Sequence, residues 1–166
     1  MRSKFPRMLS EGTTIGRYIV EGHLGSGGMG SVYRARLVGP QGFDKEVALK
    51  VLLDQNQEWQ TSLAQEARLS ASLRHRNIVD VYEFAEVDGM VLIAMEFVEG
   101  LSLTAAMVTD GAPPPSLALE IGMQACAGLG AAHAALVGMQ RSAIVHRDIK
   151  PSNLMLSVDG TVKVVD

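Results

Sequence analysis

The stretch Ile144–Asn153, near the C-terminal end, constrains this chain more than any other part of its sequence. It contains the pattern H-R-D-x-K-P-x-N, in which six positions are fixed. At roughly one residue in 20 per position, chance would bring these six together on the order of once in 10⁷ to 10⁸ starting points. A charged surface loop needs no such pattern, so we interpret the stretch as a loop that carries chemistry.

Residues 25–30, G-S-G-G-M-G, match a second pattern, G-x-G-x-x-G. This match is weak by itself, because a plain glycine hairpin would also contain it. A dinucleotide-binding fingerprint requires a helix directly after the glycines, whereas residues 31–36 alternate like a strand. Strand, glycine loop and strand together predict a flap whose backbone N–H groups can approach phosphates closely.

A lysine on the next strand and a glutamate on the following helix form a predicted pair. In V-A-L-K-V, alternation places Ala48 and Lys50 on one strand face and the branched residues on the other. Taken alone, the strand favours a solvent-facing surface lysine. Glu66, however, falls within the apolar face of the helix expected over 57–73, and a carboxylate there needs a cation. Lys50 is the expected partner, with Arg74 as the alternative.

The residue pattern predicts two groups of secondary-structure elements. Five strands are expected over 18–24, 31–37, 46–53, 79–86 and 90–97, with the helix over 57–73 inserted after the third. A short helix over 102–108, a long Ala-rich helix over 116–137 and short strands over 154–156 and 162–165 follow. This order indicates a two-lobed α+β layout rather than repeated βαβ units.

The glycine loop, the Val-Ala-Leu-Lys strand and the His-Arg-Asp loop, in this order, resemble the protein kinase superfamily over residues 18–166. The sequence L-G-S-G-G-M-G-S-V-Y is similar to that of bacterial, eukaryotic-like Ser/Thr kinases, and Lys150-Pro151 is typical of Ser/Thr rather than Tyr kinases. The resemblance implies a kinase-like fold with a five-stranded antiparallel N-lobe sheet, one helix and an incomplete, mainly helical C-lobe. The expected bounds are a flexible arm over 1–12, the N-lobe over 13–98 and the partial C-lobe over 99–166.

The same resemblance assigns catalytic and metal-binding roles by position. Asp148 would accept or orient the substrate hydroxyl proton, and Lys150 would neutralise charge on the transferred phosphoryl group. Lys50, fixed by Glu66, would grip the α- and β-phosphates of ATP. The oxygens of Asn153 and Asp166 would hold Mg²⁺, a hard cation that prefers such ligands.

The nucleotide site implied by the resemblance draws on several segments. Adenine would lie between Val32 and Ala48 on one side and Met155 on the other, with Met95 as gatekeeper and the backbone of 96–98 as the hinge that bonds the base. Plain core packing would explain both methionines as well. The expected nucleotide-binding residues are Leu24, Gly25, Gly27, Gly28, Gly30, Val32, Ala48, Lys50, Met95, Glu96, Val98 and Met155. His146 is expected to be a packed structural imidazole, and Arg147 resembles the arginine that docks a phosphorylated activation loop.

Charge and cysteine content limit the partners and the compartment. The 15 Lys and Arg against 18 Asp and Glu give a formal net charge of −3, which argues against a nucleic-acid partner. The lone Cys126 cannot form an intramolecular disulfide and is expected to be buried in a helix, which fits a reducing compartment. No stretch approaches the ~18 uncharged apolar residues of a membrane span. We therefore expect a cytoplasmic location and no membrane segment in this chain.

The chain ends at Asp166, where the kinase pattern continues with Phe-Gly, an activation loop and Ala-Pro-Glu. We therefore expect an N-terminal fragment of an ATP- and Mg²⁺-dependent Ser/Thr protein kinase, one not active alone, with a Ser or Thr hydroxyl of a protein as substrate. A non-catalytic nucleotide-binding remnant or pseudokinase-type interaction module is the alternative. A small-molecule phosphotransferase of related fold is a third hypothesis, against which Lys150-Pro151 and the glycine loop speak.

Overall fold

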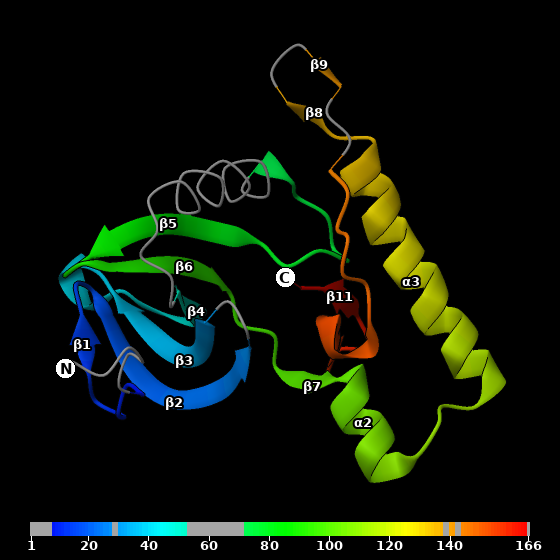
Figure 1. Ribbon diagram of the computed structural model, residues 1–166, viewed down its shortest axis with the longest axis horizontal. Coiled ribbons are helices and arrows are strands. Elements are labelled where there is room, and N and C mark those ends of the chain that lie inside the picture. The colour runs from blue at the N-terminus through cyan, green and yellow to red at the C-terminus, as the bar shows by residue number, and fades with distance from the viewer. Residues whose placement is uncertain (1–7, 28–29, 53–71, 138–139, 142–143, 166) are drawn as a thin grey trace, which may run out of the picture. The chain divides into compact units, whose positions relative to one another are not determined.

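The computed structural model describes residues 8–27, 30–52, 72–137, 140–141 and 144–165 (Figure 1). The chain forms two compact units, one made of Met1–Ala71 and Val81–Phe97, the other of Ser72–Asp80 and Val98–Asp166. The segment Ser72–Asp80 thus belongs to the second unit, although it precedes two strands of the first. The lobe bounds expected from the sequence stay a prediction.

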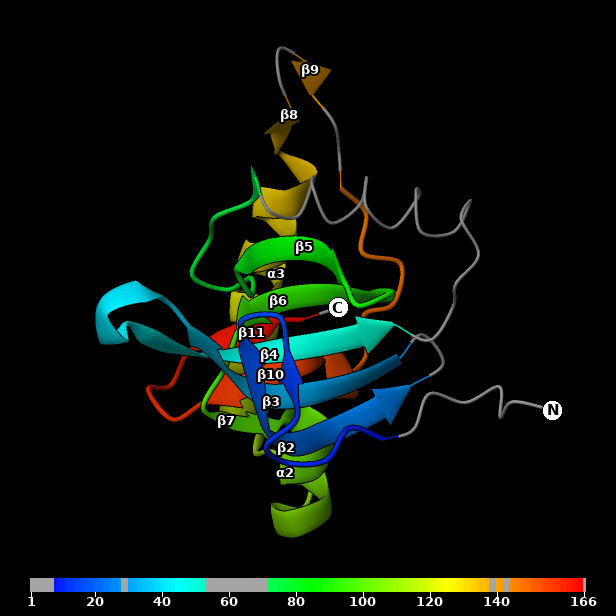
Figure 2. The same ribbon diagram turned by 90° about the vertical axis from the view of Figure 1, so that its left-hand side faces the viewer.

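The first unit is built on a six-stranded sheet with the order β1-β2-β3-β4-β6-β5. Every neighbouring pair is antiparallel, and Figure 2 shows β2, β3 and β4 side by side. The strands are β1 (Thr14–Ile15), β2 (Tyr18–Gly27), β3 (Gly30–Val38), β4 (Asp44–Leu52), β5 (Val81–Val87) and β6 (Met90–Glu96), and the short 3-10 turn η1 (Pro40–Gly42) joins β3 to β4. All five expected strands are therefore present, and β1 is an addition. The helix expected over 57–73 lies almost wholly outside the described residues.

One face of this sheet forms the core of the first unit. Val47 and Leu49 are 0% exposed and Val51 is 4% exposed, and all three belong to one apolar cluster. The cluster also contains Ile15, Tyr18, Val20, Tyr33, Ala35, Leu92 and Ala94. Ala48 and Lys50 are absent from it, so the predicted division of the V-A-L-K-V strand into two faces is confirmed. Burial of these branched side chains supplies the driving force for the sheet.

The second unit combines two helices with short strands. Its elements are β7 (Gly100–Ser102), α2 (Leu103–Asp110), α3 (Pro115–His133), β8 (Leu136–Val137), β9 (Gln140–Arg141), η2 (Pro151–Asn153), β10 (Leu154–Ser157) and β11 (Val162–Val164). β7, β10 and β11 form an antiparallel sheet in the order β11-β10-β7, and β8 pairs with β9. Ile121 and Ala125 of α3 pack with Leu154, Val162 and Val164 in the core of this unit.

Several details of the second unit differ from the expectations. The long helix begins at Pro115, a residue suited to the first helical turn, and ends at His133 rather than 137. It ends early because the backbone of Leu136–Val137 pairs with Gln140–Arg141 instead. β7 and the β8–β9 hairpin were not expected.

The expectation of a buried Cys126 is also wrong, because this thiol is exposed. It lies on α3, whose buried positions are Ile121, Ala125, Gly128 and Ala132. Among the residues that the structure describes, neither helix has the length and apolar character needed to span a bilayer.

A buried amide, Asn77, ties the segment Ser72–Asp80 to α3 and β11. Its Nδ2 donates to the carbonyl oxygen of Val162 at 2.8 Å and to Oε1 of Gln124 at 2.9 Å. The same Gln124 oxygen accepts the backbone N–H of Val162 at 2.8 Å. Asn77 is only 3% exposed, so losing any of these partners would leave a buried polar group unsatisfied. The helix approaches this residue closely at Gly128.

A second polar cluster, on β2 and β5, surrounds a buried tyrosine. The hydroxyl of Tyr18 donates to Oε2 of Glu83, which also accepts from Nη2 of Arg17 at 2.7 Å. Burial raises the pKa of Tyr18 to about 12, and the hydrogen bond to Glu83 acts in the same direction. The hydrogen bond from Arg17 holds the pKa of the Glu83 carboxyl below its usual value.

Two glycines of α3 provide a matched test of the Asn77 contact. A Cβ at position 128 would lie 2.6 Å from the backbone oxygen of Asn77, whereas a Cβ at position 130 would meet nothing within 4 Å. We expect Gly128→Ala to lower the free energy of unfolding by about 1–3 kcal/mol, as overpacking does. Gly130→Ala should raise it by up to about 1 kcal/mol, because alanine favours helix. Urea denaturation measures both changes, and equal shifts would contradict the close approach.

The alkaline pH dependence of stability should report on Tyr18. The folded-state pKa of Tyr18 is raised to about 12. The protonated hydroxyl therefore makes its full contribution to the free energy of unfolding below the unfolded-state pKa of about 10, and this contribution is lost as pH rises through 12. Between pH 8 and pH 11 the wild type should lose about 1 kcal/mol more of its free energy of unfolding than Tyr18→Phe does. Denaturation curves at the two pH values measure this difference, and identical losses would refute the burial of the hydroxyl.

Candidate active site

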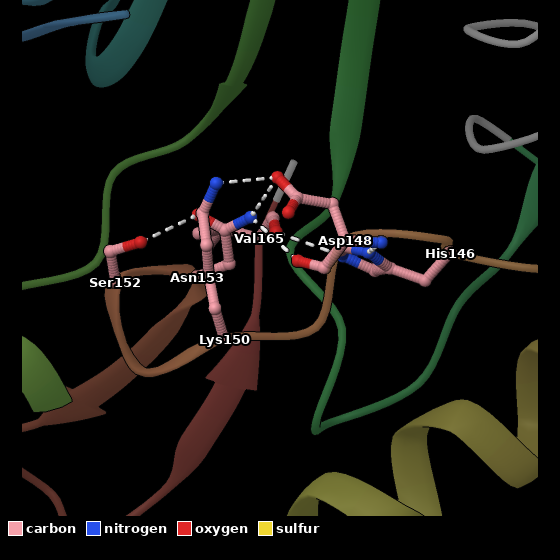
Figure 3. A network of polar contacts seen from close by, with 6 residues as sticks. All are labelled: His146, Asp148, Lys150, Ser152, Asn153 and Val165. Carbon is pink, nitrogen blue, oxygen red and sulfur yellow. Dashed lines mark hydrogen bonds and ion pairs between the residues drawn. The ribbon is translucent and has the colours of Figure 1, made fainter.

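Three polar side chains of the H-R-D-x-K-P-x-N stretch converge in the loop before β10 (Figure 3). Nζ of Lys150 lies 2.7 Å from Oδ2 of Asp148. Nδ2 of Asn153 donates to the same oxygen at 3.2 Å and to the backbone oxygen of Asp148 at 3.0 Å. Asn153 is 7% exposed, while the side chain of Asp148 is 59% exposed. A buried amide therefore fixes an exposed carboxylate beside a cation.

His146 connects this loop to the end of β11. One ring nitrogen, Nδ1, accepts the backbone N–H of Asp148 at 3.4 Å, and the other, Nε2, lies 3.0 Å from the carbonyl oxygen of Val165. Because Nδ1 is the acceptor, Nε2 carries the proton and donates to Val165. The imidazole thus acts as a bridge, and both of its nitrogens are occupied by backbone, as the expected structural role requires.

The charge of the loop carboxylate follows from its neighbours. The hydrogen bond from Lys150 holds the pKa of Asp148 below its usual value, and the Asn153 amide acts in the same direction. Asp148 is therefore ionised at neutral pH. Its exposed oxygens can accept a proton or a hydrogen bond from an incoming hydroxyl group.

In the first unit, the sheet face opposite the apolar core carries the predicted nucleotide contacts. Val32 is the antiparallel partner of Lys50, and Ala48 is the partner of Met95. Residues directly opposite each other in such a ladder share a face. Ala48 is 8% and Met95 7% exposed, and Lys50 is half-buried. This face therefore presents apolar side chains next to the lysine cation.

The glycine-rich stretch joins β2 to β3 as predicted. Gly25 pairs with Val32 and Gly27 with Gly30, so these glycines lie at the paired ends of β2 and β3. A Cβ at position 30 would overlap the backbone oxygen of Val51 on β4, so only glycine fits there. The exposed fraction of Leu24 is 50%.

A short polar chain that the sequence analysis did not single out crosses this hairpin. Nε2 of His23 lies 2.9 Å from Oγ of Ser26, which lies 2.9 Å from Oγ of Ser31. The signal in the sequence is the placement of polar residues directly beside the glycines.

A family model described as a protein kinase domain matches residues 18–166. This chain belongs to the protein kinase family. It is 36% identical over 154 residues to the Serine/threonine-protein kinase PrkC of Bacillus subtilis (strain 168), covering 91% of this chain and 22% of PrkC. It is 35% identical over 159 residues to the Tyrosine-protein kinase MasK of Myxococcus xanthus (strain DK1622), covering 91% of this chain and 25% of MasK.

A solved structure supports the same family. The crystal structure of the M. tuberculosis PknI kinase domain matches this chain with a TM-score of 0.75 and 30% identity, over 95% of this chain and 61% of that domain. The predicted kinase fold is therefore confirmed. The chain spans about a quarter of the length of the two curated relatives.

The structure distributes the predicted site residues of this kinase chain over its two units. The loop before β10 brings Asp148, Lys150 and Asn153 together. Glu96 ends β6 in the first unit, whereas Val98 and Met155 belong to the second, where Met155 pairs with Ser102 of β7. Three predicted residues lie outside the described residues: Gly28, Glu66 and Asp166.

The loop residues fit the metal that the family implies. Nδ2 of Asn153 is committed to Asp148, which leaves Oδ1 as the atom that can ligate a cation. The hydroxyl of Ser152 lies 3.4 Å from this oxygen. An amide oxygen of this kind suits Mg²⁺, which binds few protein ligands and keeps waters or substrate oxygens. The predicted Mg²⁺ site itself stays a prediction.

Removing the lysine should change the titration of the loop carboxylate. In Lys150→Met we expect the pKa of Asp148 to rise toward its usual value, because its main stabilising donor is lost. Asp159 provides an internal control, since its pKa is held low chiefly by the backbone N–H of Thr161, 2.9 Å away. Carboxyl-carbon NMR titration measures both groups. An unchanged pKa of Asp148, or equal shifts at both residues, would contradict the assignment.

Proposed function

We propose that this chain carries the nucleotide-binding and catalytic-loop parts of a kinase that transfers the γ-phosphoryl group of ATP to Ser or Thr hydroxyls of proteins. The observation that carries the proposal is the exposed, ionised Asp148, fixed by Lys150 and Asn153. An alcohol must lose a proton to attack phosphorus, and a carboxylate within hydrogen-bond reach can orient and accept that proton.

Lys150 would have two successive roles in this reaction. In the structure it pairs with Asp148 at 2.7 Å. When Asp148 accepts the substrate proton, its negative charge is neutralised and the lysine is released to interact with the transferred phosphoryl group. A cation near that group stabilises the charge that develops on its oxygens.

The nucleotide would use the sheet face of Val32, Ala48 and Met95. Apolar side chains suit the flat adenine base, and Lys50 on the same face suits the α- and β-phosphates. Gly25, Gly27, Gly28 and Gly30 would approach the phosphates, and Leu24 would also line the nucleotide site. Glu96, Val98 and Met155 would contact the base. Asn153 and Asp166 would hold Mg²⁺, which neutralises phosphate charge when bound.

The acceptor and the compartment are parts of the same proposal. Lys150-Pro151 favours Ser or Thr over Tyr, although one relative of similar identity is named a tyrosine kinase. We infer a cytoplasmic reaction, because ATP is available there and the lone Cys126 requires no oxidising compartment.

The decisive test replaces Asp148 in the natural protein that contains this chain. We expect Asp148→Asn to lower transfer of ³²P from Mg-ATP to protein at least about 100-fold, because the group that takes the hydroxyl proton is lost. Asp159→Asn removes another carboxylate, on the turn between β10 and β11, and should leave transfer unchanged. Acid hydrolysis of the labelled protein then identifies phosphoserine, phosphothreonine or phosphotyrosine.

Three results would contradict the proposal. Unaltered transfer by Asp148→Asn would exclude the assigned role, and label on tyrosine alone would exclude the Ser/Thr acceptor. Tight Mg-ATP binding by the wild-type protein without any transfer would favour the non-catalytic remnant.

A further inference from the structure

An arginine on β3 lies next to the segment that is expected to bond the base. The guanidinium carbon of Arg34 lies over the ring of Phe97, 5.4 Å from its centroid. Phe97 follows directly after β6. Cations over aromatic faces attract through the ring quadrupole. The contact therefore links β3 to the chain that leaves the sheet at residue 97.

The sheet register places Arg34 beside the predicted adenine contacts. Arg34 is the antiparallel partner of Ala48, which in turn is the partner of Met95. These three residues form one row across β3, β4 and β6, on the face opposite the apolar core. Val32, two residues before Arg34, shares that face.

Two carboxylates hold the guanidinium group. Nε of Arg34 forms an ion pair with Oε1 of Glu46 and lies 3.6 Å from Oε2 of Glu21. These partners come from β4 and β2, the strands on either side of β3. An arginine anchored in this way has already lost much of its rotamer freedom, so it can present its planar group to the ring at little further entropic cost.

We propose that Arg34 is a positioning residue for base specificity: through Phe97 it holds the hinge backbone so that the chain prefers adenine to guanine. This inference rests on the proposed function, because it takes the backbone of 96–98 as the base-binding hinge. On its Watson–Crick edge adenine offers the acceptor N1 next to the donor amine N6, whereas guanine offers the donor N1 next to the acceptor O6. A fixed backbone donor and acceptor can match only one of them, and a displaced backbone discriminates less.

A matched control lies two residues along the same strand. Arg36 is on the same face as Arg34, and its Nε lies 3.1 Å from Oε1 of Glu21 and its Nη1 3.8 Å from Oδ2 of Asp44. The side chains of Arg34 and Arg36 are similarly exposed, at 49% and 46%. Within the described part of the chain, the guanidinium that lies over the Phe97 ring is that of Arg34. Arg36→Leu therefore removes a comparable set of ion pairs and leaves the contact with Phe97 in place.

The experiment measures the dissociation constants of MgATP and MgGTP by calorimetry on the natural protein that contains this chain. We expect Arg34→Leu to weaken ATP binding about fivefold and to leave GTP binding nearly unchanged, so that the preference for ATP falls by the same factor. Phe97→Leu should reproduce this loss, and the double variant should add little to it. Arg36→Leu should keep the wild-type preference. If Arg34→Leu does not fold, Phe97→Leu carries the comparison.

The outcomes separate this inference from the proposed function. Wild-type nucleotide preference in both Arg34→Leu and Phe97→Leu would overturn the inference and leave the kinase assignment intact. An equal loss in Arg36→Leu would also overturn it, because the effect would then come from the ion pairs. A wild-type protein that binds ATP without transferring phosphate would refute the proposed activity, and the loss of preference in the variants would still support the inference. Absence of any nucleotide binding would refute both.

Discussion

Alternation along β4 decides on which face of the sheet Ala48, Lys50 and their register partners Val32 and Met95 lie. Val47, Leu49 and Val51 enter the apolar core, and this fixes Ala48 and Lys50 on the opposite face. A shift of pairing by one residue would exchange the two faces and expose the most buried side chains of the unit. The burial of the branched side chains therefore holds the cation at its predicted position. The row that includes Arg34 and Met95 depends on the same register.

The second unit relies on buried amides where the first relies on apolar alternation. Asn77 and Asn153 are 3% and 7% exposed, and each bonds both a backbone oxygen and a side chain. Short strands and an irregular loop contain few ladder hydrogen bonds, so side-chain amides satisfy the backbone groups that secondary structure leaves over. This arrangement lets the loop before β10 keep the exposed carboxylate of Asp148 at a defined place. The buried amide of Asn153 thus stabilises the loop, and the exposed acid on the same loop is the group to which we assign the proposed chemistry.

The sequence predicted best those features that repeat or that carry a fixed pattern. The strand expected over 90–97 is observed as Met90–Glu96, because its apolar run and its turn are both local signals. β7 has only three residues and is held by pairing with β10, a contact that no local pattern reveals. Ala-rich α3 contains too little contrast to show which face is buried, which explains the wrong expectation for Cys126. The pattern of the catalytic loop indicated its residues, but the hydrogen bonds of His146 depend on the path of the loop and on Val165.

Gly30 shows how one position can serve two purposes. It belongs to the glycine pattern that is expected to approach phosphates, and its lack of a side chain also lets β3 pass the backbone of Val51 without overlap. A genetic screen would therefore find no tolerated substitution at this codon even in a chain that had stopped binding nucleotide. If related sequences retain this glycine, its retention would indicate that the sheet is preserved, whether or not nucleotide binding is. At Gly25 and Gly27 an added Cβ would meet nothing within 4 Å. Substitutions at these two positions would therefore be better indicators of whether nucleotide binding has been lost.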